Sequence, residues 1–190
     1  MPMRKKTELY SLLLIGTVAL ALSILVHSKL YQIHLNPKDT KQIDAYMTKV
    51  NIITFTTSGT LKNKILATRS EHIPDNDATT FTQPTITLYQ TDEPPWHIQA
   101  LHGRSSQGSH QIDLTGDVKL HQAQSATTTD TTINTQSLTY HPNKDIAYSY
   151  VKTSLKRPNS TAEGIGVIAN FKTGNTTLLA KSKSTLTPHD

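Results

Sequence analysis

The feature that most constrains the fold of this chain is an alternation of apolar and polar residues that begins near Ile43. Apolar side chains stand at every second position from Trp96 to Ala100, from Ile112 to Leu120 and from Val167 to Phe171. A period of two puts such side chains on one face of a β-strand. β-Branched residues favour strands, and Thr alone accounts for 30 of the 190 residues. The pattern predicts an all-β, antiparallel domain over residues 43–188.

Turn-forming residues interrupt the alternation at nearly even intervals. The signals are Ser58-Gly59, Asp75-Asn76-Asp77, Asp92 to Pro95, Gln107-Gly108, Asn143 to Asp145, Pro158-Asn159 and Gly174-Asn175. This spacing predicts long strands joined by hairpins in up-and-down order, with Gly59, Gly116 and Gly174 at structural turns. A weak repeat also recurs at about the length of one hairpin, which indicates stacked hairpins or an accidental spacing in a Thr-rich chain. The repeated residues are Leu88, Leu120, Leu155 and Leu186.

Composition excludes several classes of function. The chain has no cysteine, which excludes disulfides, thiolate catalysis, Cys-ligated zinc and a lipid anchor on a cysteine. Its formal net charge is +5, of which residues 1–8 supply +2 and all later residues +3. This later charge is small and scattered, so we predict no nucleic-acid partner.

Residues 9–26, LYSLLLIGTVALALSILV, carry no charge. As a helix they would extend about 27 Å, against a hydrocarbon core of about 30 Å. The basic residues 1–8 before them predict a cytoplasmic N-terminus, a single transmembrane helix and export of the rest. A cleaved signal peptide is the alternative, with Val26-His27-Ser28 near the cleavage site. Residues 27–42 are polar and are typical of a linker.

Three motifs suggest chemistry, and each has a simpler structural interpretation. GIGVIA at 164–169 matches a dinucleotide fingerprint but is followed by a hairpin turn rather than a helix, which favours glycines within a strand. Asp75 to Asp77 starts like a calcium loop but lacks its required Gly and Glu. Asp113 and Asp117 are candidate hydrolytic carboxylates, yet they also fit a plain polar face. We therefore predict no enzymatic activity, no cofactor and no metal site.

Three short segments remain unusual: FTQP at 81–84, PPWHIQA at 94–100 and LTGDVKLH at 114–121. Together with the basic flank and single anchor they make the chain resemble the LptC family of lipopolysaccharide export proteins. The similarity extends through SGTLKNKILATRSEHIPDND at 58–77 and GIGVIANFKTGNTTLLAKSKST at 164–185. The chain departs from the family pattern at Arg157-Pro158-Asn159, where a glycine-bearing strand end is expected.

The resemblance implies a β-jellyroll of roughly fifteen antiparallel strands, whose two sheets open like a V around an apolar groove. It also implies an inner-membrane, single-pass protein with a periplasmic domain. Such a protein would take lipopolysaccharide from an ABC transporter and pass it to a periplasmic bridge protein. The alternatives are a membrane-tethered β-sandwich that binds glycan or protein without lipid passage, and an exported hydrolase.

The alternation predicts which side chains face the interior, where the resemblance places lipid. The predicted lipid-binding residues are Phe81, Ile86, Leu88, Ile98, Ile112, Leu114, Val118, Leu120, Ile133, Leu138, Ile146, Tyr148, Val167, Phe171 and Leu178. An ordinary closed core would show the same pattern. We expect the first strands, 43–55, to meet the transporter and the last hairpin, 165–186, to add edge to edge onto the bridge protein. The predicted partner-edge residues are Ile43, Ile53, Phe55, Ile165, Leu178 and Leu186.

Overall fold

The structure, a computed structural model, describes Ser23 and residues 43–106 and 108–186. The chain divides into two units, residues 1–41 and 42–190, and every strand belongs to the second. Apart from Ser23, the predicted basic tail, transmembrane helix and linker lie outside the described residues. Within the part of the chain that is described, no helix is long and apolar enough to cross a membrane.

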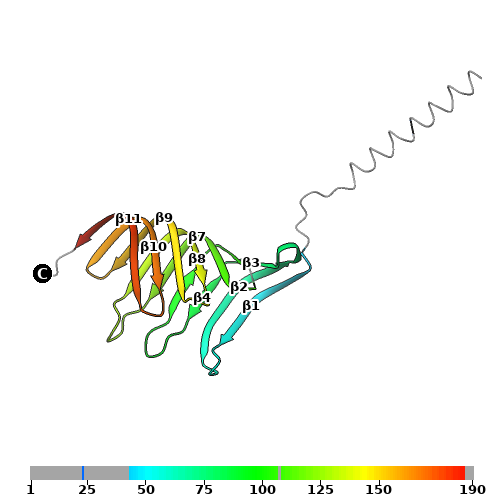
Figure 1. The fold of residues 1–190 in the computed structure, drawn as a ribbon, viewed down its shortest axis with the longest axis horizontal. Helices are drawn as coiled ribbons and strands as arrows, with labels where there is room; N and C mark the ends of the chain where they lie inside the picture. Colours follow the sequence, from blue (N-terminus) through cyan, green and yellow to red (C-terminus); the bar gives the residue numbers. More distant parts are fainter. Residues whose placement is uncertain (1–22, 24–42, 107, 187–190) are drawn as a thin grey trace, which may run out of the picture. The chain divides into compact units, whose positions relative to one another are not determined.

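Strands dominate the second unit, as the alternation predicts (Figure 1). The eleven strands are β1 (Ala45–Phe55), β2 (Leu61–Ile73), β3 (Ala78–Thr82), β4 (Thr85–Leu88), β5 (Trp96–Gln99), β6 (His102–Ser106), β7 (Gln111–Gln122), β8 (Thr131–His141), β9 (Ile146–Arg157), β10 (Ser160–Asn170) and β11 (Asn175–Leu186). A short 3-10 turn, Pro74–Asn76, joins β2 to β3. The strands are fewer than the roughly fifteen expected, because most of them run through a bend without breaking.

All the strands form one antiparallel sheet in up-and-down order. β2 pairs with β4 along its first half and with β3 along its second half, and β7 pairs in the same way with β6 and then β5. β3 with β4, and β5 with β6, therefore act as two long strands that each bend in the middle. β1 and β11 each pair with one neighbour and are the edges of the sheet.

A line of bends crosses the sheet and divides it into two halves. The backbone has positive φ at Lys49, Gln83 and Lys181, and the strand register shifts between Thr115 and Val118 and between Thr135 and Thr139. Such bulges turn a strand sharply. We call the two sides of this line the β4/β5 half and the β3/β6 half.

Hydrogen bonds tie adjacent bends together. The Gln83 amide donates to the Leu101 carbonyl at 2.8 Å, and the Leu101 amide donates to the Gly116 carbonyl at 2.9 Å. The Ala100 amide donates to the Pro84 carbonyl at 3.2 Å. The chain can therefore pass from one half to the other without leaving these backbone groups unpaired.

The two halves face each other across an apolar core. Its largest side chains include Trp96, whose ring centroid lies 5.5 Å from that of Phe171, and Tyr140, whose centroid lies 5.8 Å from that of Phe171. The buried members are Ile86, Leu88, Trp96, Ile98, Ala100, Ile112, Leu114, Val118, Leu120, Ile133, Leu138, Tyr140, Ala147, Val167, Ala169 and Phe171. Phe81 belongs to a separate, smaller cluster with Val50 and Ala67 near β1.

The prediction that Ile146 and Tyr148 face the interior is wrong. In β9 the buried positions are Ala147 and Ser149, and the alternation puts Ile146 and Tyr148 on the opposite face. Ala147 pairs with Tyr140, and aromatic rings fill the interior at this level, so a small residue fits there. Tyr148 instead lies outside, with its ring 5.2 Å from that of Tyr150.

Glycines permit several of the tight backbone positions. Gly59 and Gly174 lie in turns at φ of 82° and 71°, as predicted, whereas Gly116, at 78°, lies at the bend within β7. The two glycines of GIGVIA lie within β10, which pairs with β9 and β11. At Gly166, φ is 81° and a Cβ atom would lie 2.9 Å from Leu179 Cδ1 and 3.0 Å from the Ser149 carbonyl oxygen.

Replacement of Leu120 by alanine tests the core. Leu120 is fully buried, so the cavity and the lost burial should lower the free energy of unfolding by about 2–5 kcal/mol. Leu179→Ala is the matched control, because Leu179 is exposed and its loss should change stability by about 0.5 kcal/mol or less. Urea denaturation measures both, and equal effects would contradict the assigned interior.

Replacement of Gly166 by alanine tests how closely β10 packs against its two neighbours, β9 and β11. Gly166→Ala is destabilised both by the positive φ and by close contacts of the added Cβ. Gly59→Ala is destabilised only by the positive φ, because nothing lies within 4 Å of its added Cβ. We expect a loss of about 1 kcal/mol at Gly59 and clearly more at Gly166. Thermal denaturation compares the two variants, and an equal loss at both positions would refute the predicted crowding.

Candidate functional site

A continuous apolar row crosses the inner face of the β4/β5 half. Each member is the direct cross-strand partner of the next, so the row runs from β2 to β9 without a polar residue. Its members are Ile65, Ile86, Ile98, Leu120, Ile133 and Leu155. The row runs perpendicular to the strands and parallel to the line of bends, and it offers the same apolar surface at each step.

Hydroxyl groups interrupt the apolar interior near the bends of β8 and β9. Thr135 Oγ1 lies 3.0 Å from Ser149 Oγ and 3.3 Å from Thr153 Oγ1, and it donates to the Lys152 carbonyl at 3.1 Å. All three hydroxyl residues are buried. Because they satisfy one another and the backbone, the bend is polar inside without leaving these groups unpaired.

Opposite the line of bends, the two halves meet through a few contacts that we call the mouth. Lys62 Nζ donates to the Pro142 carbonyl at 2.9 Å and lies 4.0 Å from Asp145 Oδ1. The Gln90 side-chain amide donates to the Phe171 carbonyl, beside the contact between the Phe171 and Trp96 rings. These contacts close the interior over the apolar row.

Most predicted lipid-binding residues lie in this interior. The buried ones are Ile86, Leu88, Ile98, Ile112, Leu114, Val118, Leu120, Ile133, Leu138, Val167 and Phe171. Phe81 is also buried, but in the separate cluster near β1. Leu178 is partly buried and packs against the core. Contact of these residues with lipid stays a prediction. Trp96 and Tyr140 are missing from the predicted set although both are buried. Trp96 stands two residues from Ile98, and Tyr140 two residues from Leu138, so the alternation indicates that both face the interior.

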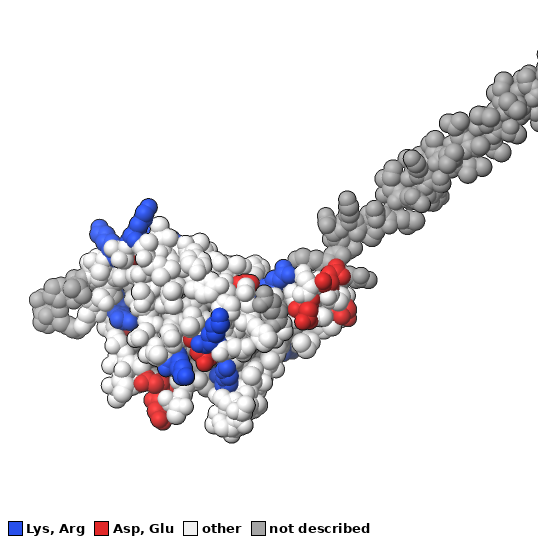
Figure 2. All heavy atoms as spheres, viewed as in Figure 1, with Lys and Arg blue, Asp and Glu red and all other residues white. Residues whose placement is uncertain are grey.

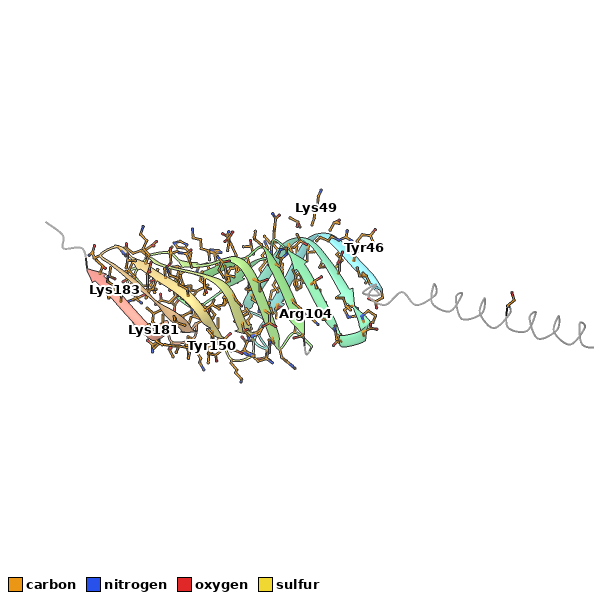
Figure 3. All side chains as sticks on the ribbon, turned by 90° about the horizontal axis from the view of Figure 1, so that it is seen from above. Tyr46, Lys49, Arg104, Tyr150, Lys181 and Lys183 are labelled. Carbon is orange, nitrogen blue, oxygen red and sulfur yellow. The ribbon has the colours of Figure 1, made fainter. Side chains whose placement is uncertain are left out.

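The predicted edge strands lie at the two ends of the sheet. Ile43, Ile53 and Phe55 are exposed at the β1 end, and Ile165 is exposed beside β11. Leu178 instead packs inward, and the side chain of Leu186 lies outside the described residues. Tyr46 and Lys49 mark one end of the sheet, and Lys181 and Lys183 mark the other (Figure 3). The partners of both edges stay predictions.

Charge differs between these two ends. Acidic side chains gather around the β1 and β3 end, whereas lysines project near β11 (Figure 2). Asp44 directly precedes β1, Glu71 lies in β2, and Asp75 and Asp77 lie in or directly after the 3-10 turn, whereas Lys181 and Lys183 lie in β11. The two edges therefore present different electrostatic surfaces to a partner.

His72 links the start of β1 to the turn before β3. Its Nδ1 lies 2.7 Å from Asp44 Oδ1, and its Nε2 lies 3.3 Å from Asp77 Oδ1. The hydrogen bond to Asp44, and then that to Asp77, raise the pKa of His72 above its ordinary value of 6.5. The charged form thus holds two acidic segments together at this edge.

The structure gives the candidate hydrolytic carboxylates ordinary partners. Asp113 accepts from Thr139 Oγ1 at 2.8 Å and from the Gln111 amide, and Asp117 accepts from the Gln136 amide at 3.2 Å. Among the described residues no cluster of three His, Cys, Asp or Glu could hold a metal ion. These contacts fit polar groups on an outer face of a sheet.

The fold of this sheet is similar to that of a periplasmic component of a lipopolysaccharide transport device. LptH of Pseudomonas aeruginosa, described as the LptA homologous component of that transport device, matches with a TM-score of 0.53 and 8% identity over 66% of this chain and 95% of its own. At this identity the likeness shows the fold. A search of curated proteins finds no match.

The sequence itself shows the family. The profile described as "Lipopolysaccharide-assembly, LptC-related" matches residues 12–187, so the chain belongs to this family. The predicted resemblance is confirmed. Membership assigns the chain to lipopolysaccharide transport, as a transport component rather than a member of a known enzyme family.

The His72 contacts predict a pH-dependent stability. Because the folded state raises the pKa of His72, its contribution is fully present below the unfolded pKa of 6.5 and is lost as pH rises through the higher folded value. His72→Gln should therefore lower the melting temperature more in acid than in mild alkali, with His102→Gln as an exposed control. An equal loss at every pH would contradict the ionic link.

Proposed function

We propose that the protein is the membrane-anchored periplasmic component that takes lipopolysaccharide from an inner-membrane ABC transporter and passes it to a periplasmic bridge protein. The observation that carries this proposal is the apolar row from Ile65 to Leu155, which continues across neighbouring strands. Family membership over residues 12–187 supports it. The lipid's acyl chains lie against this row, between the two halves of the sheet.

An apolar row of this kind lowers the main energetic cost of lipid transport, which is the exposure of acyl chains to water. An acyl chain of about twelve carbons would cost on the order of 10 kcal/mol to expose to water, at about 0.8 kcal/mol for each CH₂ group. The repeated Ile and Leu side chains remove most of that cost. Because successive positions are chemically alike, they also hold the chain with nearly equal affinity and let it move along the row.

Entry of lipid requires the mouth to open, because the row is buried when the halves are closed. The contact between Lys62 and Asp145 lies near the surface and at 4.0 Å, so it holds the halves weakly. The packing of Trp96 on Phe171 is the stronger restraint. Parting the halves at the mouth while the bends stay fixed gives the V-shaped groove that the resemblance to the LptC family implies.

The two edges supply the contacts for transfer. β11 has an unpaired edge, to which a strand of the bridge protein can add by hydrogen bonding. β1 offers a second edge with exposed Ile53 and Phe55 for the transporter. The N-terminal residues 9–26 anchor the protein in the inner membrane, with residues 1–8 in the cytoplasm and the sheet in the periplasm.

Photocrosslinking from inward and outward positions tests lipid passage. A photoreactive residue at Leu114 or Leu120 should form lipopolysaccharide adducts when the transporter is supplied with ATP. Ile168 is the matched control, because it lies on the outer face of β10 and is exposed. If the inner positions give no more adducts than Ile168, the protein is instead a tethered module that binds glycan or protein without lipid passage.

Proline in β11 tests edge-to-edge transfer. Thr176 and Thr177 pair with Ala169 and Ile168 in succession, so their N–H groups point alternately toward β10 and away from it. Of Thr176→Pro and Thr177→Pro, one should break the pairing with β10. The other should keep the fold, block the free edge and weaken binding of the bridge protein by about tenfold or more. Unchanged binding in the folded variant would contradict the proposed edge.

A further inference from the structure

A polar cavity lies at the rim of the apolar interior. Its volume is about 330 Å³, and it is lined by residues of the β4–β5 loop, the β7–β8 loop, the end of β9 and the β10–β11 turn. The residues that matter below are Glu93, Trp96, Thr127, Arg157 and Lys172. This volume is at the lower end of the range of about 300–1,000 Å³ that small-molecule sites occupy.

Three buried polar atoms of the cavity's lining residues lack a hydrogen-bond partner among the described residues. They are Glu93 Oε2, Trp96 Nε1 and Arg157 Nε. Trp96 is only 2% exposed. Buried polar groups are normally paired, so three unpaired groups on residues of one cavity leave room for a polar partner, either water or a ligand, that the described residues do not supply. One of them accepts hydrogen bonds and two donate them.

The polar wall around these atoms is fixed by its own hydrogen bonds. Thr127 Oγ1 donates to Glu93 Oε1 at 2.6 Å, which leaves Oε2 as the free oxygen of that carboxylate. Gln122 is 4% exposed, and its amide donates to Gln90 Oε1 and to the Pro94 carbonyl, each at 3.0 Å. The wall is therefore preorganised rather than a loose surface.

A second cavity extends the first. It has a volume of about 480 Å³, lies between the β7–β8 loop and the β9–β10 turn, and shares Thr127, Thr128, Thr129 and Arg157 with the first cavity. Both have more polar than apolar lining. Arg157 stands between them, at the place where the sequence departs from the LptC pattern.

The residues that line the cavity determine which class of ligand can bind there. An acyl chain would leave the three polar atoms unpaired. Arg157 and Lys172 would attract a phosphate, but a fully ionised phosphate monoester only accepts hydrogen bonds and would leave Glu93 Oε2 without a donor. A sugar hydroxyl both donates and accepts, so hydroxyls of one saccharide can donate to Glu93 Oε2 and accept from Trp96 Nε1 and Arg157 Nε.

The cavity also lies close to the apolar row. Ile98 and Leu120 belong to that row, and Trp96 and Gln122 stand two residues further along the same two strands. Two residues of strand extend about 7 Å. One amphipathic molecule can therefore lay its acyl chains on the row and its sugars in the cavity.

We propose that these two cavities form a saccharide-binding site centred on Glu93, Trp96 and Arg157. The inference rests on the proposed function in one respect, since it takes lipopolysaccharide as the source of the saccharide. It adds that the protein holds the sugar portion of its cargo through hydroxyl groups, while the acyl chains occupy the interior.

Binding measurements with the full-length protein test the site. The probes are the core oligosaccharide freed of lipid, an unrelated maltooligosaccharide and inorganic phosphate. The core oligosaccharide should bind, and Glu93→Gln and Arg157→Gln should each weaken it by about tenfold or more. Trp96→Phe keeps an aromatic ring in the core and should also weaken binding. Glu163→Gln, an exposed residue paired with Lys152, is the control and should have no effect.

The outcomes separate this site from the proposed function. The saccharide site would be refuted if the core oligosaccharide did not bind, or if it bound equally to the control and to all three cavity variants. Competition by phosphate would also refute the site. Equal binding of the maltooligosaccharide would overturn lipopolysaccharide as its specific source. Interior crosslinks from Leu120 that persist in Glu93→Gln would leave lipid passage intact when the site fails. Binding of the oligosaccharide without any interior crosslinks would support the site and refute lipid passage.

Discussion

The line of bends is the constraint on which the rest of this structure depends. One long antiparallel sheet with alternating residues would have a single apolar face open to water. Bends at Lys49, Gln83, Gly116 and Lys181, tied by hydrogen bonds such as that from the Leu101 amide to the Gly116 carbonyl, fold this face onto itself. The two halves then share one interior, whose apolar row runs parallel to the bends.

In this arrangement the bends and the mouth have different structural roles. The bends are held by backbone hydrogen bonds, whereas the mouth is held by side chains such as Lys62, Gln90 and Trp96. Side-chain contacts near the surface open at less cost than a backbone ladder. We therefore propose that the bends act as a hinge and that lipid enters at the mouth. The polar cavity beside Trp96 lies where the sugars of a lipid held inside would emerge.

Sequence predicted the strands, their order and most of the interior, because a period of two survives in any strand with one buried face. It did not locate the bulges, since a positive φ at Lys49 or Lys181 has no signal such as glycine. In β9 the alternation alone does not say which face is buried, and the large Ile146 and Tyr148 predict the wrong face. Ala147 faces the interior instead, because the rings of Tyr140 and Phe171 already fill the space at that level. Glu93 and Arg157 line the same cavity only because of the fold, so no local pattern in the sequence links them.

The central claim is that the halves part at the mouth to admit lipid. Because the chain has no cysteine, spin labels can be placed at Thr91→Cys and Asn143→Cys, which are exposed on the two sides of the mouth. Double electron–electron resonance would then measure the distance between the labels with and without bound lipopolysaccharide. We expect a longer distance in the loaded protein. An unchanged distance with lipopolysaccharide demonstrably bound would contradict it.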